Sequence, residues 1–422
     1  MAYWFTDPFV KSLLPLAGAS SMRGLSSAFG TPRIFMGANA LPEGPSIGVT
    51  ALDVFAGRCP RKKAFLVTDA FGEKAAEKVS RALQTRGFTT TIWNKALPEA
   101  PLDNVKESGQ AMQEFEPDFI VAVGGGSVID GAKAAWVHYE RPDIPHLGLI
   151  SPFAPLNLRK KAILAAIPTT SGTGSECTSV FVAHDSEFHR KVPVACGELM
   201  PDFAVLIPEF TMSMPPKLTA GTGLDALAHA MDSAAITGGN ELTHSLALTA
   251  TEMVFKYLPR AYRNGQDHEA RFRMLIAAST AGIAFGQGGV ALTHSFGHSL
   301  GSLFNIHHGI AVGVFIPFAL QFYHTITDRY LELCQTLNVM GKSKKESLSR
   351  LVKKVRSFFT ELDIPLNLKG LGISKGDFKK NMEKLVLYAV EDIDTYFSPR
   401  PMTAEQCEKI FYYAYDGKDI DF

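Results

Sequence analysis

The chain has 422 residues, a length that predicts two or three domains rather than one small core. Lysine plus arginine and aspartate plus glutamate each number 42, so the formal net charge is zero and no global field favours nucleic acid or an acidic membrane surface. Hydrophobic residues make up 46% and charged residues 20%, as in ordinary globular proteins. We therefore expect no nucleic-acid partner and no membrane partner.

The cysteines and the apolar runs bear on the cellular compartment and on membrane spans. The five cysteines are scattered and form no CxxC pair, which argues against a disulfide framework or a cysteine zinc site and favours a cytoplasmic location. The N-terminal segment lacks a basic start and carries Asp7, which argues against a signal peptide. The longest apolar run, about residues 310–323, is too short for a membrane span, contains Pro317 and predicts one buried helix.

The first half of the chain alternates short apolar runs with amphipathic segments. The apolar runs are mostly continuous rather than alternating, which is typical of strands buried on both faces of a parallel sheet. The amphipathic segments 73–86 and 102–116 predict helices between them. This alternation predicts an α/β nucleotide-binding domain. The expected strands are residues 64–69, 89–93, 119–123, 162–167 and 203–207.

A glycine-rich turn, Gly124-Gly125-Gly126-Ser127, follows the third expected strand. Glycine permits a sharp turn and a close approach to a pyrophosphate, and the helix N-terminus that follows favours an anion. The spacing is not the dinucleotide pattern GxGxxG, because Ile129 occupies the place of the third glycine. The turn predicts a phosphate-binding loop, and a tight strand-to-helix turn without a ligand is the alternative.

A second loop, residues 169–175, follows the fourth expected strand and contains only hydroxyl residues and glycines. Such a loop can surround phosphate and ribose oxygens, although serine and threonine also cap helices. Asp69 ends the first expected strand. A carboxylate there accepts hydrogen bonds from a ribose diol and repels a 2′-phosphate, which favours NAD over NADP. A turn or cap aspartate is an equally good interpretation.

The pattern changes after Pro208, where strand signals nearly vanish and helical periodicity dominates. Residues 242–258, 269–285 and 347–362 are examples of the predicted helices. We therefore predict an α/β domain at residues 1–212 and an all-helical domain at residues 213–422.

Carboxylate and imidazole side chains recur at helical spacing in the second half. Asp225 and His229 are four residues apart, as are His294 and His298, so each pair lies on one face of a helix. His308 follows ten residues after the second pair. Together, Asp225, His229, His294 and His308 offer one carboxylate and three imidazoles, a set that suits Fe(II) or Zn(II). A metal site in a chain with nucleotide-binding loops predicts an enzyme.

Four motifs occur in the order GGGSVIDGAKA, IPTTSGTGSE, MPPKLTAGTGLDALAHA and THSFGHSLGSLFNIHHG, and they resemble those of the iron-containing (group III) alcohol dehydrogenases. The segments WVHYERPD and YLPRAYRNG are most similar to the alcohol dehydrogenase half of the bifunctional aldehyde-alcohol dehydrogenases. The resemblance implies the fold shared with dehydroquinate synthase: an N-terminal α/β dinucleotide-binding domain with a parallel sheet and an all-α C-terminal domain. It also implies a homodimer or a higher homo-oligomer.

The same resemblance implies roles for particular residues. The metal ligands are the four residues above, and His298 lies near the nicotinamide. His307 precedes His308 where many members of the family have proline, and the motif register favours His308 as the ligand. The implied cofactor contacts are Asp69, Gly125, Gly126, Ser127, Thr169, Thr170, Thr173 and Lys191.

The predicted reaction is reversible hydride transfer between NAD(H) and a primary alcohol or aldehyde, with a metal that activates the substrate oxygen. His298 is predicted to relay the alcohol proton or to position the substrate. A zinc-dependent polyol dehydrogenase, a dehydroquinate-synthase-like lyase and a nucleotide-binding regulatory protein without chemistry are the alternatives. Packing or surface roles are expected for Asp232, Phe153, Phe285, Phe304, His184, His189, His244 and His268.

Overall fold

The computed structural model describes residues 29–422 except 45–48, 153, 188–189 and 237–238. The described chain divides into two compact units, Phe29–Met214 and Pro215–Phe422. The predictions about the N-terminal segment before residue 29, Phe153 and His189 lie outside the described residues.

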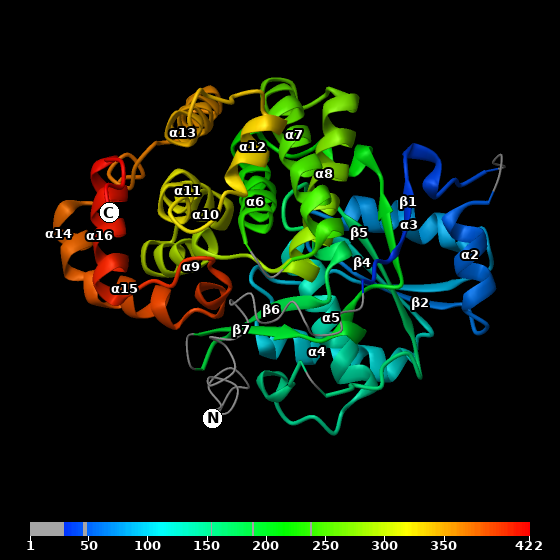
Figure 1. Ribbon diagram of the computed structural model, residues 1–422. Coiled ribbons are helices and arrows are strands. Elements are labelled where there is room, and N and C mark those ends of the chain that lie inside the picture. Colours follow the sequence, from blue (N-terminus) through cyan, green and yellow to red (C-terminus); the bar gives the residue numbers. More distant parts are fainter. Residues whose placement is uncertain (1–28, 45–48, 153, 188–189, 237–238) are drawn as a thin grey trace. The chain divides into compact units, whose positions relative to one another are not determined.

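The first unit contains a six-stranded sheet in the order β1-β8-β5-β4-β2-β3, and all its neighbouring strands are parallel (Figure 1). Each of the five expected strands is present. The sixth, β1, was not predicted, because it has only four residues and they are partly or fully exposed. The strands are β1 (Arg33–Met36), β2 (Lys63–Val67), β3 (Thr89–Trp93), β4 (Phe119–Gly124), β5 (Ile163–Pro168) and β8 (Phe203–Leu206).

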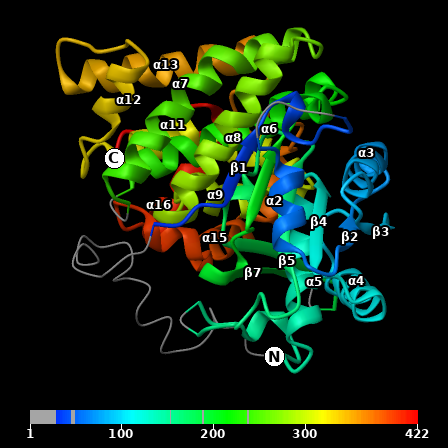
Figure 2. The same cartoon turned by 90° about the vertical axis from the view of Figure 1, so that its right-hand side faces the viewer.

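Helices cover both faces of this sheet, because successive side chains of a strand point to opposite faces. Phe65 and Val67 of β2 pack in the cluster that includes α4 and α5, whereas Ala64 and Leu66 pack in the cluster that includes α2 and α3. Figure 2 shows α2 and α3 beside the strands. The helices are α2 (Ala51–Arg58), α3 (Glu73–Gln84), α4 (Leu102–Phe115) and α5 (Gly126–Glu140).

A two-stranded antiparallel hairpin, β6 (Val180–Asp185) and β7 (Arg190–Ala195), completes the first unit and was not predicted. Its strand β6 alternates between buried and partly buried residues. Short 3-10 helices connect the strands: η3 (Ala38–Ala40), η4 (Leu147–Leu149), η5 (Ser175–Cys177), η6 (Gly197–Leu199) and η7 (Pro208–Thr211).

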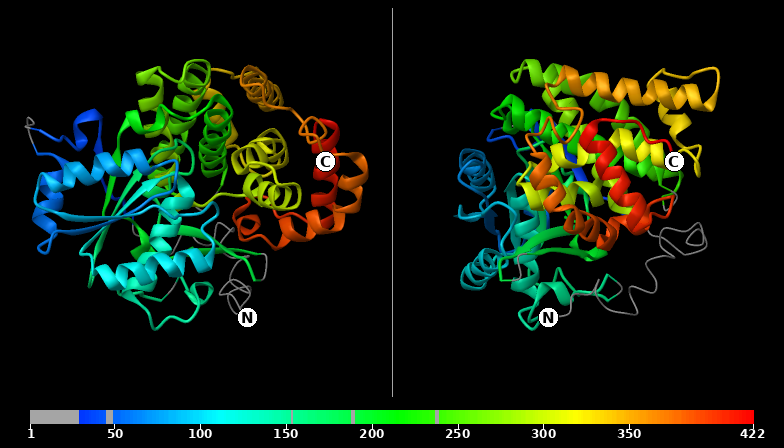
Figure 3. Two further views of the ribbon diagram at one scale, coloured as in Figure 1. Left: turned by 180° about the vertical axis from the view of Figure 1, so that it is seen from behind. Right: turned by 90° about the vertical axis from the view of Figure 1, so that its left-hand side faces the viewer.

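The second unit is helical throughout its described residues, and its helices run from green to red in Figure 3. One apolar cluster is centred on α6, α7, α8, α12 and α13, a second on α9, α15 and α16, and α11 contributes to both. The helices are α6 (Pro216–Ala235), α7 (Glu241–Arg263), α8 (His268–Gly288), α9 (Leu292–Phe304), α10 (His308–Gly313), α11 (Ile316–Tyr323), α12 (Tyr330–Thr336), α13 (Lys344–Glu361), α14 (Lys375–Lys380), α15 (Met382–Glu391), η8 (Ile393–Phe397) and α16 (Ala404–Asp416).

The single buried helix predicted near residues 310–323 is wrong in one respect. Two helices occupy this run, α10 and α11, and Pro317 lies in the first turn of α11, where its missing N–H leaves no helical bond unmade. Among the described residues, no single helix is long and apolar enough to cross a membrane, and α8 and α9 meet that test only as a pair bent by 105°.

Candidate active site

Helix α6 carries Asp225 and His229 one turn apart, and their exposed fractions are only 2% and 5%. Small residues on this helix let its neighbours approach closely, since a Cβ atom at Gly223 would lie 2.3 Å from Leu258. Burying a charged or polar side chain costs free energy unless it finds a partner. The sequence of α6 therefore brings two polar groups into the interior, where each of them needs a bonding partner.

His294 and His308 reach the same region from α9 and α10. Helix α9 ends at Phe304, and the C-cap residue Asn305, whose φ of 51° is left-handed, turns the chain. Helix α10 then begins at His308 itself. The two helices pack tightly at Gly297, where a Cβ atom would lie 2.4 Å from Val312 Cγ1.

The four side chains expected to bind a metal lie together. One ligand atom from each of Asp225, His294 and His308 lies within 4.8 Å of the others. His308 Nε2 lies 3.3 Å and His229 Nε2 lies 3.9 Å from Asp225 Oδ1. The His229 ring stacks on His294, with centroids 4.6 Å apart, and on Phe285, with centroids 4.1 Å apart. Phe285 thus lies beside this cluster, whereas the sequence led us to expect only a packing role for it.

The donor atoms fit a divalent transition metal. His294 Nε2 is buried and has no hydrogen-bond partner among the described residues. An unsatisfied buried nitrogen is costly, and a cation that accepts its lone pair removes that cost. A carboxylate oxygen with imidazole nitrogens is a donor set that Fe(II) and Zn(II) accept.

The protonation states also suit a metal. Burial lowers the pKa of His229 to about 3 and lowers the pKa of His294 well below its ordinary value. Both imidazoles are therefore neutral at pH 7, the form that binds metals. Burial raises the pKa of Asp225, but the surrounding imidazoles lower it by more than burial raises it. The net pKa of Asp225 therefore lies below its ordinary range. Within the cluster, the Asp225 carboxylate thus faces neutral nitrogen donors from His229 and His294.

Asp232 orients His294, a role that its sequence position did not reveal. Its Oδ2 atom accepts hydrogen bonds from Ala291 N–H at 2.9 Å and Thr293 Oγ1–H at 2.5 Å, and it lies 3.3 Å from His294 Nδ1. We assign the imidazole proton to Nδ1, which leaves the Nε2 lone pair for a metal. The spacing of Asp232 from Asp225, about two helical turns, was the available signal.

Two further histidines border the cluster. The His298 ring stacks on His308, with centroids 5.3 Å apart, and meets His294 edge-on at 5.9 Å. His307 lies instead against α6, since a Cβ atom at Gly221 would stand 2.8 Å from His307 Nδ1. The cluster of possible ligands therefore includes His308, and the His307 ring packs on the neighbouring helix.

In the first unit, the two expected cofactor loops follow β4 and β5, which are neighbours in the sheet. Parallel strands bring their carboxyl ends to one edge, so the loops are adjacent. A Cβ atom at Gly126 would lie 2.5 Å from Thr173 Cγ2, and one at Gly125 would lie 3.4 Å from Thr170 Cγ2. Thr169 directly follows β5. The structure therefore joins the glycine-rich and hydroxyl-rich segments into one surface.

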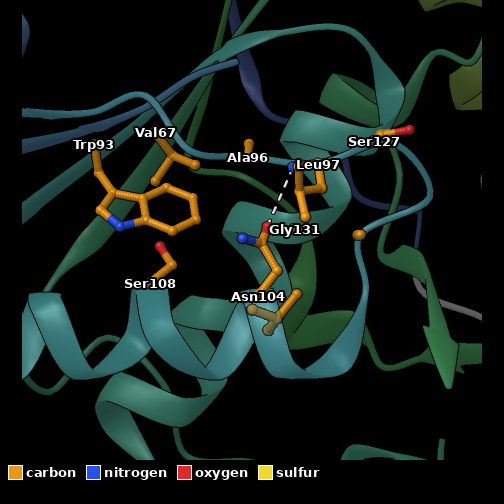
Figure 4. A pocket seen from close by; sticks show the side chains of 10 residues that line it. Val67, Trp93, Ala96, Leu97, Asn104, Ser108, Ser127 and Gly131 are labelled. Atoms are coloured by element: carbon orange, nitrogen blue, oxygen red, sulfur yellow. Dashed lines mark hydrogen bonds between the residues drawn. The ribbon is translucent and has the colours of Figure 1, made fainter. Parts of the chain in front are cut away.

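Ser127 lies in the first turn of α5, and its Oγ accepts a hydrogen bond from Glu99 N–H at 3.1 Å. Figure 4 shows Ser127 beside a cavity of about 10 Å³ that is also lined by Trp93, Leu97 and Asn104. Leu97 N–H donates to Asn104 Oδ1 at 3.2 Å across one side. This volume holds about one water molecule, so the cavity is too small for a cofactor.

Two family descriptions cover most of the chain. Residues 45–208 match the iron-containing alcohol dehydrogenases, and residues 219–415 match the C-terminal part of the Fe-containing alcohol dehydrogenase family. The chain belongs to the iron-containing alcohol dehydrogenase family. Membership confirms the predicted fold and the predicted oxidoreductase activity, and it argues against the lyase and regulatory alternatives.

Several relatives of this iron-containing alcohol dehydrogenase span most of its length. The NADPH-dependent butanol dehydrogenase of Clostridium saccharobutylicum is 35% identical, covering 86% of this chain and 94% of that protein. The NAD-dependent methanol dehydrogenase of Bacillus methanolicus is 33% identical, covering 83% and 91%. The aldehyde-alcohol dehydrogenase of Clostridium acetobutylicum is 31% identical over 82% of this chain but 43% of that protein. The solved alcohol dehydrogenase from Oenococcus oeni superposes with a TM-score of 0.82 at 27% identity, covering 92% and 100%.

Two implied cofactor contacts of this iron-containing alcohol dehydrogenase have structural partners of their own. Asp69 Oδ1 accepts hydrogen bonds from Phe71 N–H at 3.0 Å and Gly72 N–H at 2.7 Å, which shapes the turn into α3. Lys191 lies on β7 opposite His184, within the hairpin. The cofactor roles of Asp69 and Lys191 stay predictions.

Proposed function

We propose that this protein transfers hydride reversibly between NAD(H) and a primary alcohol or aldehyde, with Fe(II) as its metal and Zn(II) as the alternative. The observation that carries the proposal is the convergence of one carboxylate and three imidazoles from three helices, with all but His308 buried. The butanol and methanol dehydrogenases among its relatives support a small primary alcohol. Residues 1–212 would form the cofactor-binding domain and residues 213–422 the metal- and substrate-binding domain.

The proposed roles follow from the chemistry of each side chain. Asp225, His229, His294 and His308 would hold the metal, which when bound supplies a Lewis acid that polarises an alcohol or carbonyl oxygen. Alcohol oxidation moves a hydride from the carbinol carbon to the nicotinamide ring and releases the hydroxyl proton. His298 accepts that proton and returns it during aldehyde reduction.

The loops of the first unit would bind the cofactor. The amides of Gly125 and Gly126 open helix α5, where the helix dipole favours a pyrophosphate. The hydroxyl groups of Thr169, Thr170 and Thr173 supply hydrogen bonds to phosphate and ribose oxygens. Close packing of the two loops keeps these donors together before the cofactor arrives.

Metal content and turnover on one sample test the proposal. We expect about one iron per chain in protein purified without oxygen, together with NADH-dependent reduction of short aldehydes. His294→Ala should lose most of the metal and the activity, whereas His268→Ala, at an exposed histidine, should keep both. Full metal content in His294→Ala would contradict the ligand assignment. Zinc with glycerol oxidation, but without turnover of monohydric primary alcohols or their aldehydes, would favour the polyol dehydrogenase.

The choice between NAD and NADP is tested at Asp69, because one relative uses NADPH and another uses NAD. Asp69→Asn keeps an oxygen that can accept the two N–H groups of the turn but removes the charge that repels a 2′-phosphate. We expect the ratio of kcat/KM for NADP to that for NAD to rise in this variant. An unchanged ratio with normal folding would remove Asp69 from cofactor selection.

The protein is further proposed to be a cytoplasmic homo-oligomer of at least two chains. All five cysteines are buried and none of them forms a disulfide, which suits a reducing compartment. Light scattering coupled to size-exclusion chromatography measures the mass in solution. A mass equal to one 45.9 kDa chain at micromolar concentration would contradict the oligomer.

A further inference from the structure

A carboxylate pair faces His298 from the segment after α15. His298 Nδ1 lies 2.9 Å from Asp392 Oδ2 and 3.7 Å from Asp394 Oδ2. The side chains of Asp392 and Asp394 are 15% and 16% exposed, and that of His298 is 28% exposed. All three lie in the second unit, where α9 packs against α15 and η8.

Both carboxylate oxygens of Asp392 have hydrogen-bond partners. It precedes the 3-10 helix η8, and its Oδ1 accepts the Asp394 N–H at 2.9 Å. This capping bond fixes the carboxylate plane and leaves Oδ2 directed at the imidazole of His298. The contact is therefore made by an oriented carboxylate rather than by a mobile surface side chain.

The two carboxyl groups differ in how readily they ionise. Burial and the neighbouring Asp392 raise the pKa of Asp394 well above its ordinary value. Burial also raises the pKa of Asp392, but His298 lowers it more, and the net pKa lies below its ordinary range. The carboxyl group that makes the shorter contact with His298 is therefore the more readily ionised of the two.

We propose that Asp392 is a positioning residue for His298: it accepts the Nδ1 proton, so the neutral imidazole carries its lone pair on Nε2 and stays beside His294 and His308. This inference rests on the proposed function, in which His298 exchanges a proton with substrate. As the hydride leaves the carbinol carbon, the O–H bond breaks and an Nε2–H bond forms. The resulting imidazolium is stabilised by the Asp392 carboxylate, as in other carboxylate–histidine pairs.

A cation is the rival explanation, because His298, Asp392 and Asp394 are also close enough to share one. The two hypotheses differ in what Asp392→Asn does. If Asp392 positions His298, the variant keeps the metal content of the wild type. If these residues bind a metal, the variant loses part of that content.

The first experiment compares Asp392→Asn with Glu391→Gln, an exposed carboxylate one residue away. We expect Asp392→Asn to lower kcat on the order of 10²-fold, with KM for the alcohol and metal content little changed. Glu391→Gln should match the wild type in all three. Unchanged kcat in an active, folded Asp392→Asn protein would overturn the inference and leave the proposed function intact.

The second experiment does not depend on turnover. Long-range ¹H–¹⁵N spectra of metal-free protein labelled at histidine report the tautomer of each ring. We expect His298, identified from the signal lost in His298→Gln, to be the Nδ1–H tautomer in the wild type and to lose that state in Asp392→Asn. An Nε2–H tautomer in the wild type would sink the inference. Absence of any alcohol or aldehyde turnover would instead sink the proposed function, and this spectrum would still decide the role of Asp392.

Discussion

Gly309 and Gly221 are in backbone contact: a Cβ atom at Gly309 would stand 1.9 Å from the Gly221 carbonyl oxygen and 2.9 Å from Asp225 Cβ. Gly309 directly follows His308, and Gly221 lies one helical turn before Asp225. This contact between α10 and α6 accompanies the 3.3 Å approach of His308 Nε2 to Asp225 Oδ1. Only a residue without a side chain permits it.

Gly309→Ala should therefore separate the two helices and weaken metal binding. We expect a loss of about 1–3 kcal/mol in the free energy of unfolding from overpacking. A fall in metal affinity on the order of tenfold should accompany it, because the ligand spacing changes. Urea unfolding and metal titration measure the two effects. Gly376→Ala, where the new Cβ atom would lie 3.8 Å from Ser374 Oγ, is the control. Unchanged metal affinity in Gly309→Ala would show that this contact does not determine the ligand spacing.

Asp232→Asn should weaken metal binding without removing a ligand. The asparagine amide is a poorer acceptor than the carboxylate for the three donors that contact Asp232 Oδ2. His294 therefore loses the contact that fixes its tautomer. Loss of such an orienting group typically reduces metal affinity by roughly 10- to 100-fold. Competition with a chelator measures the affinity, and the thermal stabilisation by added metal should shrink in parallel. Asp416→Asn, at an exposed position, should bind metal like the wild type.

Gly126→Ala should weaken cofactor binding, because the new methyl group would overlap Thr173 Cγ2 at 2.5 Å and Thr173 Oγ1 at 2.9 Å. Overpacking of about 1–3 kcal/mol on these loops corresponds to a loss of roughly 5- to 150-fold in NADH affinity. Fluorescence titration with NADH measures it. Gly131→Ala, where the nearest atom is Ala100 Cβ at 3.6 Å, is the matched control on the same helix. Equal NADH affinities in the two variants would argue against the loops as the cofactor site.

Lys133→Met should destabilise the first unit. The buried Lys133 Nζ donates to five oxygen atoms of Ser175, Thr178 and Val180 at 2.7–3.1 Å, and it lies near the buried carboxyl of Asp130. Removing one member of a buried charge pair typically costs about 3–5 kcal/mol, because the other charge stays buried. Urea unfolding should show this loss, and adding Asp130→Asn should restore part of it. A loss below about 1 kcal/mol would mean that the lysine does not hold this loop.

The elements that sequence patterns predicted well are those with strong local signals. Continuous apolar runs identified five strands of the sheet, and helical periodicity identified α7, α8 and α13. Strand β1 was missed because it is short and partly exposed. The β6–β7 hairpin was also missed, although residues 180–183 of β6 form a continuous apolar run. The break between α10 and α11 also escaped, although Pro317 marked it.

In the candidate site, too, the sequence connected some residues and not others. Asp225 with His229, and His294 with His298, share a helix face by spacing alone. Asp392 lies 94 residues from His298 in the sequence, and no local pattern connects them. Asp232 lies about two helical turns after Asp225 in the sequence, but its hydrogen-bond partner Thr293 is 61 residues away.

By itself, the sequence determined the chemistry that is available and its local arrangement: the imidazole and carboxylate donors, the faces on which they lie, and the loops that end buried strands. Only the tertiary structure decided that α6, α9 and α10 meet at one point and that Asp232 and Asp392 orient two of the histidines. The physical reason is that spacing along one helix follows from backbone geometry, which is the same in every protein. The distance between helices depends instead on packing, and here a contact between two glycines sets how closely α6 and α10 approach.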